Sequence, residues 1–103
     1  MSEDVKLSHS AALILRTIDC GYFYGFDIMD VTGLPSGTVY PALRRLERDG
    51  LITAKWEDEA TAVAEQRPAR RYYRMTRAGK QSMVRLVEKY PLLEKLTPAK
   101  RAN

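Results

Sequence analysis

The stretch "PSGTVYPALRRLERDG", residues 35–50, combines helical spacing with a basic surface. Its apolar residues recur every three or four positions, at Val39, Leu43 and Leu46. The arginines that fall on the other side are Arg44, Arg45 and Arg48. A helix of this pattern buries one face and leaves the other in water. The stretch therefore predicts a surface helix with one side in the core and a basic side in water.

Both ends of this helix are marked in the sequence. Ser36 follows a Leu-Pro turn and is predicted to cap the helix, and Gly50 is typical of the position just after a helix end. Pro41 lies just past the first turn, where its missing N–H loses one bond, to residue 37. Because residue 37 is a glycine, the proline ring has room and the helix continues.

Two helices are predicted upstream. Residues 8–20, "SHSAALILRTIDC", have Ser8 or Ser10 as a cap and one apolar side. The residues of that side are Ala11, Ile14, Leu15 and Ile18. Residues 22–32, "YFYGFDIMDVT", follow as a short second helix, and its expected core residues are Phe26, Ile28 and Met29.

Downstream of residue 50 the pattern becomes that of β-strands. Segments 51–57, "LITAKWE", and 70–76, "RRYYRMT", alternate apolar and polar residues. The polar segment 58–69 between them has no pattern, which predicts a hairpin with a long flexible tip. Thr76 is expected to cap a last helix over residues 77–90, after which Pro91 ends or kinks it and "LLEKL" adds an apolar turn.

This order of elements predicts a mainly α protein with a small β-hairpin. A helix-turn-helix followed by a hairpin is a winged helix-turn-helix, whose third helix enters the DNA major groove while the hairpin, or wing, lies along the flanking backbone or minor groove. We expect one continuous domain. Residues 1–75 form its DNA-binding part, and residues 76–103 form a C-terminal dimerisation helix and a charged tail.

Composition is that of one globular domain, with 103 residues of which 45% are hydrophobic and 29% charged. No apolar run reaches the ~20 residues of a membrane helix, and the polar start is unlike a signal peptide. Cys20 is the only cysteine, which leaves no pair for a disulfide and suits a reducing cytosol. We therefore expect a cytoplasmic protein in which Cys20 is a buried thiol rather than a redox sensor.

The charge is distributed unevenly. Residues 67–89 hold eight basic residues and one acidic, a balance of +7, whereas residues 1–34 hold two basic and five acidic, a balance of −3. This asymmetry favours a polyanion as partner, and a merely solvated basic face is the alternative. The sequence has no catalytic constellation, metal-ligand spacing or glycine-rich phosphate loop, and His9 is its single histidine. Neither an enzyme nor a cofactor or metal site is expected.

Three stretches resemble the PadR family of winged-helix transcriptional regulators. They are "YGFDIM" in the second helix, "PSGTVYPALRRLERDGLI" over the third, and "QRPARRYYRMTRAGK" over the return strand of the wing and the cap of the last helix. The resemblance covers roughly residues 10–90. The short C-terminus is similar to that of the compact subfamily with a single C-terminal helix, and this implies a homodimer.

The pattern and the resemblance together predict two groups of DNA contacts. Those on the third helix are Ser36, Thr38, Tyr40, Arg44, Arg45 and Arg48. Those on the stem of the wing are Arg67, Arg70 and Arg71. Glu57, Asp58 and Glu59 depart from the pattern, because phosphate repels them unless they point away. Compact family members bind flat drugs between tryptophans of the last helix, but Trp56 lies on the first wing strand, so a small-molecule effector is not supported.

The expected dimer interface runs along the first and last helices, at Leu15, Met83, Leu86, Val87, Tyr90 and Leu93. Core packing competes with this reading for the last helix. The predicted function is a repressor that binds double-stranded DNA at an inverted repeat as a homodimer. The alternative is a winged-helix module that binds protein and modulates another regulator, which the acidic wing start supports. Glu47 and Asp49 also leave open a merely solvated face on the third helix.

Overall fold

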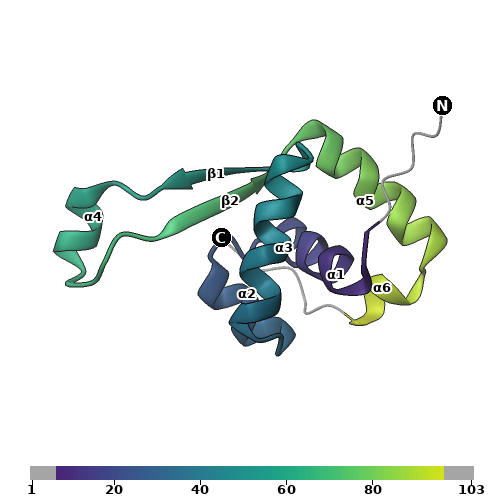
Figure 1. Ribbon diagram of the computed structural model, residues 1–103, viewed down its shortest axis with the longest axis horizontal. Coiled ribbons are helices and arrows are strands. Elements are labelled where there is room, and N and C mark those ends of the chain that lie inside the picture. Colours follow the sequence, from purple (N-terminus) through teal and green to yellow (C-terminus); the bar gives the residue numbers. More distant parts are fainter. Residues whose placement is uncertain (1–6, 97–103) are drawn as a thin grey trace.

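The computed structural model describes residues 7–96, so the acidic start and the predicted charged tail lie outside the described residues. The elements follow in the order α1 (His9–Asp19), α2 (Gly25–Thr32), α3 (Ser36–Arg48), β1 (Ile52–Trp56), α4 (Glu59–Ala64), β2 (Arg71–Met75), α5 (Arg77–Lys89) and α6 (Leu92–Leu96). The two strands pair in an antiparallel hairpin that projects from a helical body (Figure 1). The predicted fold, mainly α with a small β-hairpin, is confirmed.

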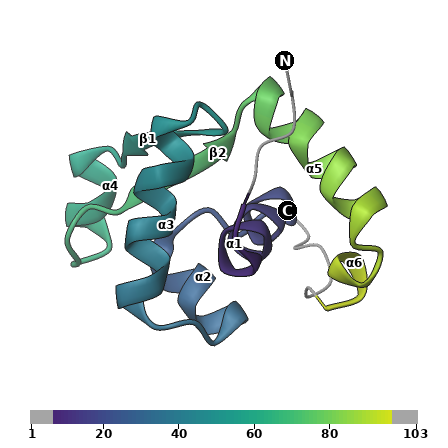
Figure 2. The same cartoon turned by 45° about the vertical axis from the view of Figure 1, so that its right-hand side comes forward.

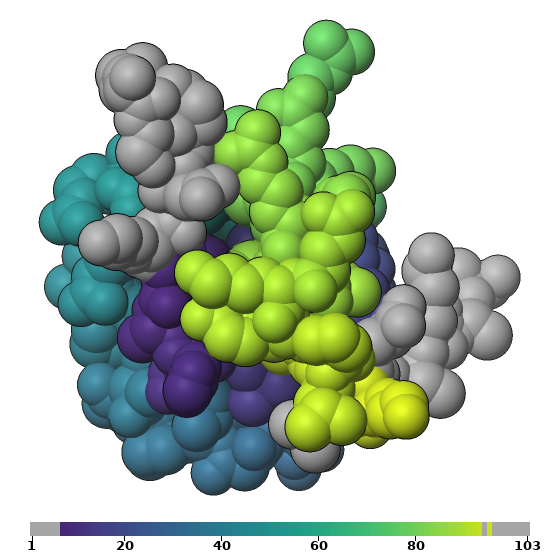
Figure 3. Space-filling view, turned by 90° about the vertical axis from the view of Figure 1, so that its right-hand side faces the viewer, coloured from purple at the N-terminus to yellow at the C-terminus, as the bar shows by residue number. Residues whose placement is uncertain are grey.

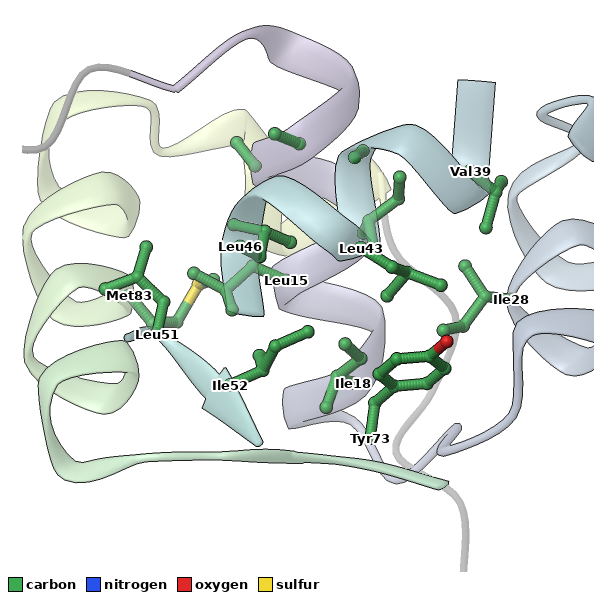
Figure 4. Close-up of a cluster of buried hydrophobic side chains, with 14 of the residues drawn as sticks. Leu15, Ile18, Ile28, Val39, Leu43, Leu46, Leu51, Ile52, Tyr73 and Met83 are labelled. Carbon is green, nitrogen blue, oxygen red and sulfur yellow. The ribbon is translucent and has the colours of Figure 1, made fainter. Parts of the chain in front are cut away.

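Helix α1 lies at the centre of the body, between α3 and α5 (Figure 2). Ser8 begins it, because the Ser8 hydroxyl oxygen accepts a hydrogen bond from the N–H of Ala11 at 3.1 Å. Ile14, Leu15 and Ile18 are fully buried and pack with side chains of the other helices and the hairpin into one core (Figure 4). Cys20 is buried as well, as predicted.

Helix α2 begins at Gly25, three residues later than predicted. The preceding aromatic segment instead runs beside β2, where the carbonyl of Phe23 accepts a hydrogen bond from the N–H of Tyr73 at 2.8 Å. With this start Ile28 faces the core and Phe26, two positions earlier, faces away from it. The prediction that Phe26 is a core residue is therefore wrong, since Phe26 is 71% exposed.

Helix α3 includes Ser36 as its first residue, so the prediction that Ser36 caps it is wrong by one position. Pro35 takes the cap position, because its extended backbone directs its carbonyl at the N–H groups of Thr38 and Val39, at 2.9 and 3.0 Å. The helix continues through Pro41, as predicted.

The hairpin starts directly after α3. Gly50 has a φ of 77° and turns the chain from α3 into β1, in the left-handed region that glycine tolerates best. The register runs from Ile52 opposite Met75, on the body, to Trp56 opposite Arg71, farther out. The two predicted strands are confirmed.

The tip of the hairpin contains helix α4, so the prediction of a long unpatterned loop is wrong. Asp58 caps this helix, with its carboxylate accepting from the N–H of Ala60 at 3.4 Å. The alanine-rich sequence of α4 has high helix propensity, and Ala62 is buried. A helix of six residues, less than two turns, is too short to show a periodic pattern in the sequence.

Helix α5 packs along the side of α1 opposite α3 (Figure 2). Thr76 caps it as predicted, because the Thr76 hydroxyl oxygen accepts from the N–H of Gly79 at 3.0 Å. The same hydroxyl donates to the carbonyl of Gly50 at 2.7 Å, which ties α5 to the end of α3. None of the helices within residues 7–96 is long and apolar enough to cross a membrane.

Candidate nucleic-acid interface

The solvent side of α3 carries the predicted reading arginines. Arg44 and Arg45 are exposed, and neither makes a hydrogen bond or ion pair within residues 7–96. Arg48 is exposed as well, and its Nε lies 3.6 Å from the carboxylate of Asp49. The polar side chains at the start of the same helix are the exposed Ser36 and the half-buried Thr38. Helix α3 thus presents cations to solvent while Val39, Leu43 and Leu46 hold its other side in the core (Figure 4).

A hollow separates α3 from the wing. It is lined by Tyr40, Arg44, Glu47, Arg71 and Tyr73. The carboxylate of Glu47 accepts from the Arg71 guanidinium at 3.4 and 3.5 Å, which joins α3 to β2 across the hollow. The Arg71 guanidinium also lies 5.4 Å from the centre of the Trp56 ring. Burial raises the pKa of Tyr73, so its hydroxyl stays neutral beside these charges.

Arg67 is turned into the wing rather than toward solvent. Its two terminal nitrogens donate to the two carboxylate oxygens of Glu57 at 2.6 and 2.8 Å, and its Nε donates to Glu65 at 3.1 Å. The side chain of Glu57 is 3% exposed and that of Arg67 18%. This geometry corrects the predicted phosphate contact of Arg67, because all three guanidinium nitrogens already face carboxylates of the tip.

The same pair accounts for the acidic start of the wing. The hydrogen bond from Arg67 is the largest cause that lowers the pKa of Glu57 to about 2, against the opposing effect of burial. The backbone N–H of Arg70 and the hydroxyl of Tyr72 also donate to this carboxylate, at 3.2 and 3.1 Å. Glu57 therefore points inward as a charged anchor, and only Asp58 and Glu59 of the acidic trio are exposed.

Hydrogen bonds continue from the wing to the segment that leads into α2. The hydroxyl of Tyr24 donates to that of Tyr72 at 2.8 Å, and the Arg70 guanidinium lies 4.6 Å from the centre of the Tyr24 ring. The hydrogen bond with Tyr24 is the first cause that raises the pKa of Tyr72 to about 12. We call Glu57, Arg67, Tyr72 and Tyr24 the wing clamp.

The wing clamp was missed by the sequence analysis, although one signal was present. Glu57 continues the alternation of β1 and so shares a side with Lys55, and Lys55 pairs with Tyr72 in the register of the hairpin. A carboxylate at this position therefore faces the polar side chains of the return strand. The sequence did not indicate that the tip folds back through α4 and brings Arg67 to it.

The charges of the wing are therefore divided along its length. The basic residues of its stem are Lys55, Arg70, Arg71 and Arg74. The exposed acidic residues of its tip are Asp58, Glu59 and Glu65. Within residues 7–96 no three His, Cys, Asp or Glu side chains are grouped closely enough to hold a metal ion. A phosphate backbone is attracted to the stem beside α3 and repelled by the tip.

The predicted dimer interface divides into buried and exposed residues. Leu15, Met83 and Leu86 are buried in the core of the protomer, which corrects the expectation that they contact a partner, because they have almost no surface left. Val87 and Leu93 are half-buried, and Tyr90 is exposed with its ring 5.9 Å from that of His9. Figure 3 shows the end of the molecule that α5 and α6 form. The exposed large apolar residues in this part of the chain are Val84, Tyr90 and Leu92.

Comparison with known proteins places this architecture in a family. Residues 14–85 match the transcriptional regulator PadR-like family. No curated protein matches the chain. Among solved structures, a PadR family transcription regulator from Clostridium difficile R20291 is 24% identical with a TM-score of 0.72, over 86% of this chain and 94% of that one.

Two further structures are similar. A transcriptional regulator from Clostridium thermocellum is 26% identical with a TM-score of 0.65, over 84% of this chain and 86% of that one. A PadR-like transcription factor from Bacteroides fragilis is 25% identical with a TM-score of 0.62, over 84% of this chain and 82% of that one. Because the family match runs from α1 through the wing into α5, the chain belongs to the PadR-like family of DNA-binding transcriptional regulators.

Proposed function

We propose that the protein is a repressor that binds double-stranded DNA at an inverted-repeat operator as a homodimer. The observation that carries this proposal is the state of Arg44 and Arg45, which stand exposed and without partners in residues 7–96 on a helix whose opposite side is locked in the core. A recognition helix in the major groove needs this combination. An arginine there reads a guanine through two hydrogen bonds, to O6 and N7.

The remaining contacts position the helix. On α3 these are Ser36, Thr38, Tyr40 and Arg48, and on the stem of the wing they are Arg70 and Arg71. Hydroxyl and guanidinium groups of this kind bind phosphate oxygens, which sets the register of a protein on DNA without reading its sequence. Arg71 stands beside α3 across the hollow, so one backbone segment reaches both elements. Arg67 is not part of the proposed surface.

Dimerisation is proposed through α5 and α6. One winged helix presents too few base-reading side chains to single out a site in a genome, whereas two-fold pairing doubles them. It also makes the operator an inverted repeat with half-sites one helical turn apart, ~34–36 Å, or a multiple of it. The surface that supports this includes Val87, Tyr90 and Leu93 together with the exposed Val84 and Leu92.

The dimer is tested by Leu92→Asp. Leu92 is exposed, so a charge there spares the core, whereas Leu86→Asp places a charge in the core and unfolds the chain. We expect light scattering to show a monomer for Leu92→Asp, with loss of operator binding. A parent protein that is a monomer at micromolar concentration and binds its site one copy at a time contradicts the proposal.

The whole proposal is tested by selecting bound DNA from a random pool. We expect enrichment of an inverted repeat, and a reporter promoter that carries it should be transcribed less when the protein is present. A pool that stays random after repeated rounds contradicts sequence-specific binding. An enriched site that raises transcription contradicts only the repressor role.

The acidic tip of the wing favours one second candidate, a module that binds another protein. Asp58, Glu59 and Glu65 are exposed and lie in or next to α4. Helix α4 forms the far end of the hairpin (Figure 1). The salt dependence of binding distinguishes the two candidates, because affinity for DNA falls steeply as the salt concentration rises. A chain that binds no DNA at any salt concentration but retains a protein partner through the tip supports the second candidate.

A further inference from the structure

The ring of Tyr40, on α3, rests on Gly25, the first residue of α2. A Cβ atom built on Gly25 would lie 2.6 Å from Cε1 and the hydroxyl oxygen of Tyr40 and 2.8 Å from Cζ. Carbon atoms in good contact lie about 3.5–4.0 Å apart, so any side chain at this position collides with the ring. Gly25 is buried while Tyr40 remains 40% exposed. The ring therefore has one face on α2 and the rest toward solvent.

We propose that Gly25 is a positioning residue for DNA recognition, because its missing side chain seats the Tyr40 ring against α2 and holds it at the edge of the hollow beside Arg44. This inference rests on the proposed function, in which Tyr40 contacts DNA. Seated in this way, Tyr40 meets DNA in one prepared orientation and does not have to be ordered when it binds.

Substitution of Gly25 moves the ring and spares the fold. The atoms in the way belong to the free end of a half-exposed side chain, which swings into solvent when a methyl group takes its place. Gly25 does not have a positive φ, so alanine fits its backbone. Alanine is also a better helix former than glycine, so α2 itself is favoured by the change.

Gly79 provides the contrast. It is a second buried glycine in the first turn of a helix, but a Cβ atom there would collide with the backbone carbonyl oxygen of Leu51. A carbonyl inside a packed turn cannot rotate away as a tyrosine ring does. We therefore expect Gly79→Ala to lower the Tm clearly and Gly25→Ala to leave it nearly unchanged.

The inference is tested by a double-mutant cycle on DNA affinity. Affinity for the DNA selected from the random pool is measured by fluorescence anisotropy for the parent, Gly25→Ala, Tyr40→Ala and the double variant. We expect each single variant to bind about tenfold more weakly, the size of one lost hydrogen bond to a charged phosphate oxygen. The double variant should bind no more weakly than Tyr40→Ala alone, because Gly25 acts only through the ring. Additive losses in the double variant overturn the inference.

A second measurement needs no DNA. NMR cross-peaks between the ring protons of Tyr40 and the α protons of Gly25 are expected in the parent, and the ring resonances of Tyr40 should move in Gly25→Ala. Absent cross-peaks in the parent overturn the inference. If Tyr40→Ala weakens binding and Gly25→Ala does not, this inference alone fails. If neither variant weakens binding, the DNA contact of Tyr40 in the proposed function fails with it.

Discussion

Arg44 on α3 and Arg67 in the wing both have carboxylates nearby in the sequence, and the fold gives them opposite surroundings. Helical periodicity carries Arg44 away from the core to a face with no partner among residues 7–96. Arg67 follows Gln66, whose φ of 57° reverses the chain at the end of α4, and the N–H of Arg67 bonds back to the carbonyl of Ala62 at 3.1 Å. That reversal brings the Arg67 guanidinium to Glu57.

Positive charge alone does not define a nucleic-acid interface. A guanidinium that faces carboxylates with all three of its nitrogens, as Arg67 does, must break those pairs to bind phosphate. Arg71 faces Glu47 with one nitrogen only, and Arg44 has no such pair among residues 7–96. In the wing clamp, Arg67 bonds to Glu57 and holds the tip in its folded position. Arg44 on α3 is exposed and accessible to a ligand.

The largest effect on DNA binding is expected for α3. Arg44→Ala and Arg45→Ala should each weaken specific binding by ~1–3 kcal/mol, because a bidentate base contact is lost, and should leave the Tm unchanged. Anisotropy with the selected operator measures the first effect and thermal unfolding the second. Lys80→Ala, an exposed change on α5, is the matched control. If both arginine variants bind as tightly as the parent, α3 is not the reading element.

Arg67→Ala should show the reverse, a lower Tm with little direct loss of base reading. Removal of Arg67 leaves the Glu57 carboxylate in the wing without the partner that stabilises its charge. Glu57→Gln in the same background should recover part of the Tm, because the neutral amide is easier to bury. Arg67→Lys keeps the charge but loses the bidentate contact, so its Tm should lie between that of Arg67→Ala and that of the parent. An unchanged Tm in Arg67→Ala means that the clamp does not hold the wing.

Arg44 and Arg67 also differ in how well the sequence predicts their surroundings. Periodicity identified α3, its buried side and its exposed arginines, because a regular helix assigns each residue to a face by spacing alone. It placed Arg67 wrongly, because the position of that residue depends on a single left-handed residue, Gln66, and on contact between the two ends of the tip. The assignments of Leu15 to the dimer interface and of Phe26 to the core were wrong as well. Burial of those two depends on how many elements cover a helix and on where the helix begins.

A smaller effect is expected on the salt dependence of binding. Arg70→Ala and Arg71→Ala should each reduce the slope of log K against log[salt] by ~0.9, the value for one released phosphate contact. Arg67→Ala should leave the slope unchanged, although all three residues lie on the same return segment of the wing. Titrations at several salt concentrations provide the comparison. A slope reduced equally by all three variants contradicts the division between the stem and the clamp.

The smallest effect is expected from acid, and it is confined to the clamp. The pKa of Glu57 is lowered from its ordinary value of 4.5 to about 2 in the folded protein. The carboxylate therefore stabilises the folded wing fully above pH 4.5, and this contribution is lost as the pH falls toward 2. Trp56, the only tryptophan, directly precedes Glu57 and reports this change by its fluorescence. The parent should lose wing structure in this window, whereas Glu57→Gln, which has no charge to lose at this position, should lack that step. Identical acid titrations of the two proteins contradict the assignment of Glu57 as the charged anchor, and leave the reading role of α3 untouched because Glu57 lies in the wing and not on α3.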